Sequence, residues 1–174
     1  MNKTLWAVLV IVAGILCAMA DLAHSAGNSD ITGYTGVPWG TEYKEASTML
    51  DEMGGGKLYA PSCDGFPCST YFTDGLGFGG VNFKRLAIFD NGMKLVAVKM
   101  MAEAPTACSP AVFDAVVDWL ESAYGTPDVS MSTATMVGTK QVFSWRRKSG
   151  NVTFRYVHMG EHNGYSILFT QMKE

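Results

Sequence analysis

Cysteines are the residues best suited to chemistry in this chain. Cys63 and Cys68 lie in the stretch SCDGFPCSTY, and Cys108 stands alone just before a predicted helix. Two nearby thiols can form a disulfide, bind a metal or exchange electrons. A structural zinc site takes four ligands, whereas the local sequence supplies two. The Cys-x-x-Cys spacing of thioredoxin-like sites is absent here, as is Cys-x-x-Cys-His for haem attachment.

A hairpin across residues 64–67 would place Cys63 and Cys68 opposite each other at disulfide distance. We therefore predict this disulfide, with Cys68–Cys108 and Cys63–Cys108 as the alternative pairings. If the first pair forms, Cys108 is a candidate free thiol. It is then either a reactive group near a helix N-terminus or a small buried residue, and free cysteine is among the most buried residue types.

Other catalytic or metal-binding patterns are weak. His158, Glu161 and His162 occur together in HMGEH, but the predicted position is a strand end and loop, and the order is not His-Glu-x-x-His. The nucleophile motif Gly-x-Ser-x-Gly is missing. The sequence therefore predicts no catalytic residues, no metal ligands and no cofactor.

The N-terminus has the pattern of a secretory signal peptide. Lys3 precedes an uncharged apolar run from Leu5 to Met19, and Ala18-Met19-Ala20 suits signal peptidase. We predict a signal peptide over residues 1–20 and a location in the periplasm or outside the cell. Such compartments are oxidising, which favours disulfides.

Composition excludes some partners. The chain has 13 basic and 16 acidic side chains, a net charge of −3. This balance gives no electrostatic basis for nucleic-acid binding. It also provides no polybasic segment for anionic lipids, so we expect no stable membrane anchor once the signal is removed.

The remaining chain has the length and pattern of one domain. We predict a flexible leader over residues 21–35 and a single α+β domain over 36–174. An amphipathic helix begins after Thr41, its expected cap, and ends at Gly54-Gly55-Gly56. A second begins at Pro110 and ends before Gly125. The two helices are predicted to pack on an antiparallel sheet.

The first predicted hairpin turns at Asn91-Gly92, a sequence typical of two-residue turns. This register pairs Ile88 with Leu95 and Leu86 with Ala97. Apolar residues on the opposite face form a candidate interaction surface: Phe89, Val96 and Val98.

The second predicted hairpin turns at Ser149-Gly150. Its register places Phe143 opposite Tyr156 and Trp145 opposite Phe154 on a packed face. The other face is wet and carries Arg146 and Arg155, a second candidate interaction surface. Because each half has a helix followed by strands, the order also fits a tandem duplication.

Three short motifs carry a resemblance to a known group. These are Trp39-Gly40, Leu120-x-x-x-Tyr124-Gly125-x-Pro127, and Trp145 in the following strand. In them the chain resembles small exported bacterial proteins with helix-then-sheet units, as in the β-lactamase-inhibitor-like and small outer-membrane-assembly lipoprotein folds. The resemblance implies a protein-binding role. The chain departs from the lipoprotein members because it lacks an attachment cysteine.

These observations lead to one functional prediction and one alternative. The first is an exported, non-catalytic binding or accessory module that contacts another envelope protein. The alternative is a thiol-dependent redox or metal-binding periplasmic protein, based on the odd number of cysteines.

Overall fold

The computed structural model describes residues 29–63, 67–78, 81–102, 110–136, 138–159 and 162–172. Within these ranges, two helices, α2 (Tyr43–Glu52) and α3 (Pro110–Tyr124), accompany a large antiparallel sheet, which confirms the α+β class. The strands of this sheet are β3 (Cys68–Tyr71), β4 (Leu76–Phe78), β5 (Val81–Phe89), β6 (Leu95–Ala102), β7 (Val129–Thr135), β8 (Gly138–Arg146), β9 (Gly150–Met159) and β10 (His162–Gln171). A separate small pair consists of β1 (Gly33–Tyr34) and β2 (Val37–Pro38).

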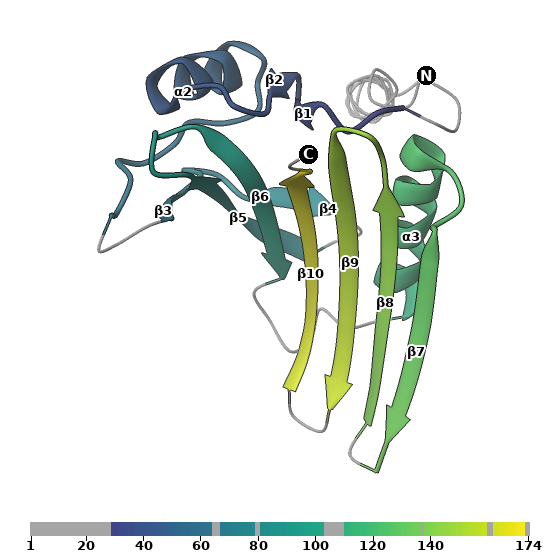
Figure 1. Cartoon of the computed structure of the whole chain (residues 1–174). Coiled ribbons are helices and arrows are strands. Elements are labelled where there is room, and N and C mark those ends of the chain that lie inside the picture. The colour runs from purple at the N-terminus through teal and green to yellow at the C-terminus, as the bar shows by residue number, and fades with distance from the viewer. Residues whose placement is uncertain are drawn as a thin grey trace, which may run out of the picture.

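The strands of the sheet follow the order β3-β5-β6-β10-β9-β8-β7, with β4 also paired to β5 (Figure 1). All neighbouring strands are antiparallel. The first half of the chain therefore supplies one end of the sheet and the second half supplies the other, and β6 and β10 join them. Strand β7 forms one edge, and β3 and β4 share the opposite edge.

Both helices pack against one face of the sheet, which we call the inner face. The ring of Phe113 in α3 lies 5.6 Å from that of Phe154, and the ring of Tyr43 in α2 lies 5.5 Å from that of Phe89. The inner face forms most of the core, because alternate strand residues point toward the helices. Its fully or almost fully buried members include Phe83, Ala87, Phe89, Val98, Met100, Trp145, Val152, Phe154, Tyr165, Ile167 and Phe169.

Helix α2 starts without the predicted side-chain cap. The hydroxyl of Thr41 donates to the carbonyl oxygen of Pro38 at 2.9 Å. Instead, the backbone N–H of Tyr43 donates to the carbonyl oxygen of Met93 in the β5–β6 loop, also at 2.9 Å. A tertiary contact thus satisfies one of the N-terminal donors that a cap would otherwise serve.

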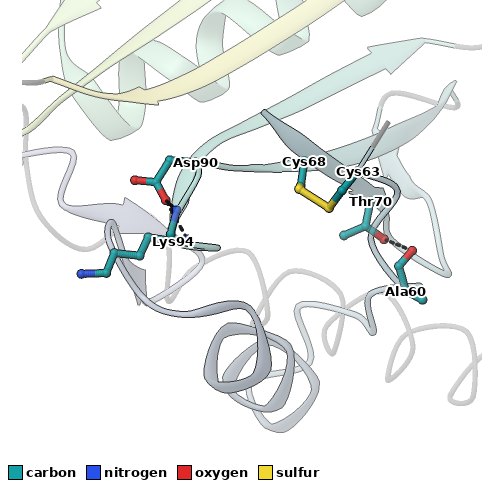
Figure 2. Close-up of a disulfide and its surroundings, with 7 residues drawn as sticks. Ala60, Cys63, Cys68, Thr70, Asp90 and Lys94 are labelled. Carbon is teal, nitrogen blue, oxygen red and sulfur yellow. Dashed lines mark hydrogen bonds between the residues drawn. A yellow bond between two sulfur atoms is a disulfide. The ribbon is translucent and has the colours of Figure 1, made fainter. Parts of the chain in front are cut away.

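The β5–β6 hairpin forms where predicted, but its predicted register is wrong. Phe89 pairs with Leu95, and a bulge then shifts Ile88 to Ala97. The Asp90 carboxylate accepts the N–H groups of Gly92 and Lys94 at 2.9 and 3.0 Å, and Figure 2 shows the second contact. These bonds stabilise a three-residue loop in which Met93 takes the left-handed conformation, with φ 58°.

The β8–β9 hairpin differs from its prediction in register only. Phe143 pairs with Phe154 and Trp145 with Val152, because the turn lies at residues 148–149, where the Arg147 N–H donates to the Gly150 carbonyl at 2.8 Å. The shift is two residues, so every side chain stays on its predicted face. The predicted alternation of packed and wet faces is confirmed.

The prediction of a flexible leader up to residue 35 is wrong for its last part. Ile31 and Tyr34 are buried in the core. The Asp30 carboxylate accepts the N–H and hydroxyl groups of Ser149 at 2.9 and 2.6 Å. Residues 30–35 therefore belong to the domain, because their two large apolar side chains pack against it.

Residues 57–62 lie along the outer edge of β3. The N–H of Tyr59 donates to Tyr71 O at 3.0 Å, and Ser62 and Ser69 exchange two backbone hydrogen bonds. Cys63 and Cys68, whose sulfur atoms lie 2.10 Å apart, join the two segments directly beyond these bonds (Figure 2). The structure thus forms the predicted disulfide, whereas Cys108 lies outside the described residues.

Candidate binding face

The sheet has a second face, away from the helices, which we call the outer face. In Figure 1, α3 lies behind β7 and β8, so the outer face of this part of the sheet is toward the viewer. The strand registers place these residues on it: Lys84, Leu86, Ile88, Lys99, Met101, Met131, Lys140, Val142, Ser144, Arg146, Thr153, Arg155, Val157, Ser166, Leu168 and Thr170.

Charge is distributed unevenly between the two layers. The outer face carries five basic residues: Lys84, Lys99, Lys140, Arg146 and Arg155. None of the eight strands of the sheet contains an Asp or Glu. The chain nevertheless has more acidic than basic residues overall. The outer face is therefore a basic surface on an acidic protein, and it favours an acidic partner.

Apolar side chains lie among these charges. Leu86, Ile88, Val142 and Leu168 are half-buried. Met131, at the β7 edge, is 58% exposed. The apolar side chains of the outer face can bury area against a partner, and its basic side chains favour a partner with negative charge.

Both predicted arginines lie on this face. Arg146 and Arg155 are exposed, as the alternation predicts. Arg146 pairs with Asn151, so Arg155 lies four residues further along β9. That separation is about 13 Å at the rise of an antiparallel strand. The two arginines therefore belong to a broad surface and do not form one cluster.

The predicted apolar interaction surface around the first hairpin is wrong. Phe89 and Val98 are 0% exposed and lie on the inner face, and Val96 is half-buried. The sequence showed two apolar faces in this hairpin, and the helix side chain of Tyr43 covers the one with Phe89. Apolar residues of this hairpin on the open side include Leu86, Ile88 and Met101.

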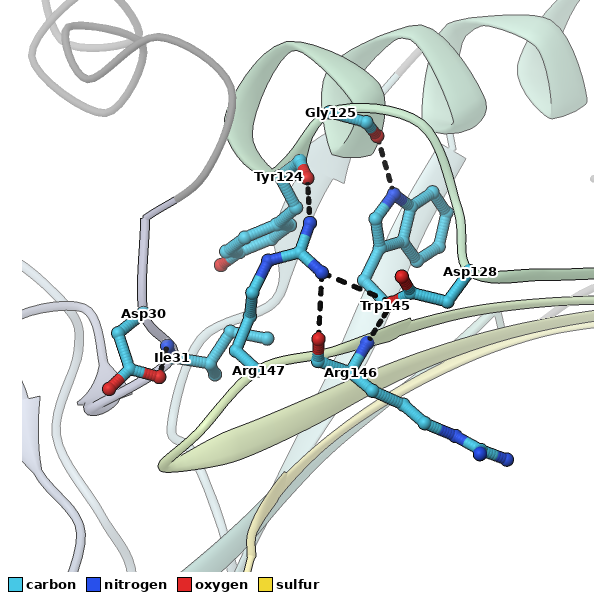
Figure 3. A network of polar contacts seen from close by, with 8 residues as sticks. All are labelled: Asp30, Ile31, Tyr124, Gly125, Asp128, Trp145, Arg146 and Arg147. Carbon is cyan, nitrogen blue, oxygen red and sulfur yellow. Dashed lines mark hydrogen bonds and ion pairs between the residues drawn. The ribbon is translucent and has the colours of Figure 1, made fainter.

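The end of β8 next to Arg146 is firmly attached to the end of α3 (Figure 3). The Asp128 carboxylate accepts the Arg146 N–H at 2.6 Å and lies 3.1 Å from Nη1 of Arg147. The Arg146 N–H, and secondarily the charge of Arg147, hold the pKa of Asp128 below its ordinary value. Figure 3 shows the Arg146 side chain pointing away from this network. The backbone of Arg146 is fixed while its guanidinium extends outward.

One buried charge was not predicted from the sequence. Arg85, on the inner face, is 5% exposed, and its Nη1 donates to Gly55 O at 2.6 Å. Its Nη2 lies 3.4 Å from the Asp74 carboxylate, and its guanidinium carbon lies 4.3 Å from the centre of the Phe72 ring. No local pattern identifies it, because a lone arginine in an alternating strand is usually solvated.

A cavity of about 500 Å³ opens beside Arg85, where the chain passes from β3 to β4. It is lined by Tyr59, Tyr71, Phe72, Thr73, Asp74, Gly75, Asn82, Lys84 and Arg85. Because the charge of Arg85 already has a carboxylate and a carbonyl as partners, a structural role accounts for this residue.

The described ranges of the chain bear on both metal binding and membrane crossing. In these ranges, no group of three or more His, Cys, Asp or Glu side chains lies close enough together to hold a metal ion. Neither of the helices seen in the same ranges has both the length and the apolar character needed to cross a bilayer.

Comparison with known proteins adds no family to this description. No protein-family model matches the chain, and no curated protein or solved structure matches it either.

Proposed function

We propose that this protein is an exported, non-catalytic binding module that contacts an acidic region of another envelope protein through the outer face of its sheet. The observation that carries the proposal is the charge pattern of that face, with five basic residues and no acidic residue in any strand of the sheet. Solvated antiparallel sheets usually mix both signs of charge, so basic residues alone on four strands, β5, β6, β8 and β9, favour a specific electrostatic partner.

The export part of the proposal rests on the N-terminal sequence. The pattern of Lys3, an apolar run and Ala18-Met19-Ala20 supports signal cleavage after Ala20. The Cys63–Cys68 disulfide is consistent with an oxidising compartment. Intact-mass measurement of the protein from fractionated cells tests this part. A chain that starts at Met1 in the cytoplasmic fraction would contradict it.

Site-specific photo-crosslinking tests the binding face directly. A photoreactive amino acid at Thr153, in the middle of the outer face, is expected to capture a specific envelope protein in intact cells. The matched control has the same amino acid at the exposed Thr48 of α2, on the helical layer. Capture of the same protein with equal yield from both positions would overturn the proposal.

The captured protein is then purified and its affinity measured. Arg146→Glu with Arg155→Glu is expected to weaken binding by at least tenfold, because each change reverses a charge on the face. Raising the salt concentration is expected to weaken the wild-type interaction as well. Binding that neither the charge reversal nor salt affects would contradict an electrostatic contact.

We further propose that the domain arose by tandem duplication of a helix-plus-strands unit. Helix α2 precedes β3 to β6, and α3 precedes β7 to β10. The two sets of strands meet at the β6–β10 pair. Each set therefore has one end at an edge of the sheet and its last strand, β6 or β10, at the junction with the other set. Separate expression of the two halves, followed by mixing, tests whether each is a unit that pairs with the other.

A further inference from the structure

The two edges of the sheet differ in how they are protected. Residues 57–62 hydrogen-bond along β3, and the Cys63–Cys68 disulfide holds them in place. At the other edge, β7 pairs with β8 on one side, and no segment within the described ranges pairs with its other side. An unpaired strand edge presents a row of N–H and C=O groups that can bind another strand.

Strand β7 also lacks the usual features that block such binding. Its sequence, VSMSTAT, contains no charged residue and no proline. Its register with β8 is regular from Val129–Ser144 to Thr135–Gly138, without a bulge. Protective charges are expected on edge strands, yet here Lys140, Arg146 and Arg155 lie on the interior strands β8 and β9. This arrangement leaves seven residues of open, uncharged edge.

We propose that β7 is the contact surface for a second copy of this chain. The two β7 strands pair antiparallel about a two-fold axis that passes midway between the two Ser132 residues, which joins two sheets into one continuous sheet. This register uses all seven residues, from Val129 opposite Thr135 of the second copy to the reverse pair. Antiparallel pairing keeps the outer faces of both copies on the same side.

The side chains of β7 suit pairing with themselves. On the outer face, Met131 lies opposite Thr133 of the second copy, and the two Met131 side chains are diagonal neighbours about the axis. Diagonal neighbours are about 7–8 Å apart, within reach of a long side chain. Met131 is 58% exposed in the single chain and becomes covered by this contact. Ser130 and Ala134 on the other face are small and present no steric obstacle.

The basic outer face does not oppose this dimer. Lys140 of β8 is the register partner of Thr133 of β7. In the proposed register, Lys140 and its counterpart are separated across the sheet by three strand spacings, about 14 Å. This exceeds the Debye length of about 8 Å at physiological ionic strength, so their repulsion is largely screened. When β7 pairs with β7 of a second copy, both edges are uncharged, so no like charges lie opposite each other. A second copy is therefore favoured as occupant.

Sedimentation velocity over a range of protein concentrations tests the proposal. All 174 residues are expressed and the protein is purified without reductant. The wild-type chain is expected to show a reversible monomer–dimer equilibrium. Met131→Lys is expected to weaken dimerisation by about tenfold or more, because it places two like charges diagonally across the axis. Thr48→Lys, on the exposed side of α2, adds the same charge elsewhere and is expected to leave the equilibrium unchanged.

Hydrogen exchange identifies the surface that is used. Amides of β7 that point away from β8 are expected to exchange more slowly as the concentration rises into the dimeric range, while those of residues 57–62 are unaffected. A wild-type chain that stays monomeric at the highest concentration would overturn the proposal. So would a dimer that forms equally well in Met131→Lys or protects a surface other than β7.

Discussion

The indole N–H of Trp145 donates a hydrogen bond to the carbonyl oxygen of Gly125 at 2.6 Å. Trp145 is fully buried in β8, and Gly125 follows α3 in the left-handed conformation, with φ 74°. The bond joins the C-terminal end of the helix to the C-terminal end of β8, the strand next to the β7 edge of the sheet. Since α3 contributes Val116 and Leu120 to the core, this contact helps to fix the helical layer on the inner face.

We predict that Trp145→Phe lowers the free energy of unfolding by about 2–4 kcal/mol, since it leaves a cavity and removes the donor for Gly125 O. Urea denaturation followed by circular dichroism measures the loss. Trp119→Phe, at a half-buried position of α3, is the matched control and should cost less. Equal losses in the two variants would show that the buried bond is unimportant.

The left-handed backbone of Met93 leads to a second prediction. Met93→Ile is expected to be less stable than Met93→Leu by about 1 kcal/mol, because β-branched side chains tolerate positive φ poorly. The two side chains have the same number of atoms, so burial is closely matched. Thermal unfolding of both variants measures the difference, and a more stable Ile variant would contradict the loop conformation.

The contact between Asp30 and Ser149 predicts a dependence of stability on pH. The Ser149 hydroxyl and then its backbone N–H lower the pKa of Asp30 from its ordinary value of 3.8. A carboxyl with a lowered pKa in the folded state stabilises the fold above its unfolded pKa, and this stabilisation is lost as the pH falls through the folded pKa. Asp30→Asn should therefore be less stable than the wild type near pH 7.

The difference between Asp30→Asn and the wild type should shrink below pH 4. Urea unfolding at pH 7 and near pH 2.5 measures it. Ser149→Ala is expected to cause a related loss, and the double variant should cost less than the sum of the two because both residues form one contact. A difference that is constant with pH would show that the Asp30 charge plays no part.

The disulfide leads to a fourth prediction. Replacing Cys63 and Cys68 by serine is expected to cost less than about 3 kcal/mol, since the bridge closes a short loop. The amides of Tyr59 and Ser62 should exchange faster in this variant, because residues 57–62 are no longer held against β3. Amides of β9, far from the bridge, serve as the internal control. Unchanged exchange at Tyr59 would show that its hydrogen bonds suffice without the bridge.

Local signals in the sequence predicted the elements well. Three glycines after α2, and Pro110 and Gly125 around α3, mark the helices because backbone conformation alone limits these residues. The alternation in β8 and β9 predicted which side chains are buried, and with it the exposure of Arg146 and Arg155. The disulfide was also predictable, since its two cysteines lie within one turn.

Contacts between distant segments could not be predicted in this way. The hairpin register depends on the Asp90 carboxylate binding two N–H groups of its own loop. The burial of Ile31 depends on packing against residues more than a hundred positions away, near Ser149. The choice between the two apolar faces of β5 and β6 depends on which face the helices cover, and for that reason Phe89 was assigned to the wrong surface.

The charge distribution between the layers has a consequence for how the molecule moves. Helices α2 and α3 hold six acidic side chains and one lysine, while the outer face holds five basic ones. The acidic helices and the basic outer face therefore place opposite charges on the two sides of the sheet, which contributes an electric dipole across it. In the field of a negatively charged body the domain would rotate during diffusion, so that most first collisions occur with the strands foremost and the helices trailing.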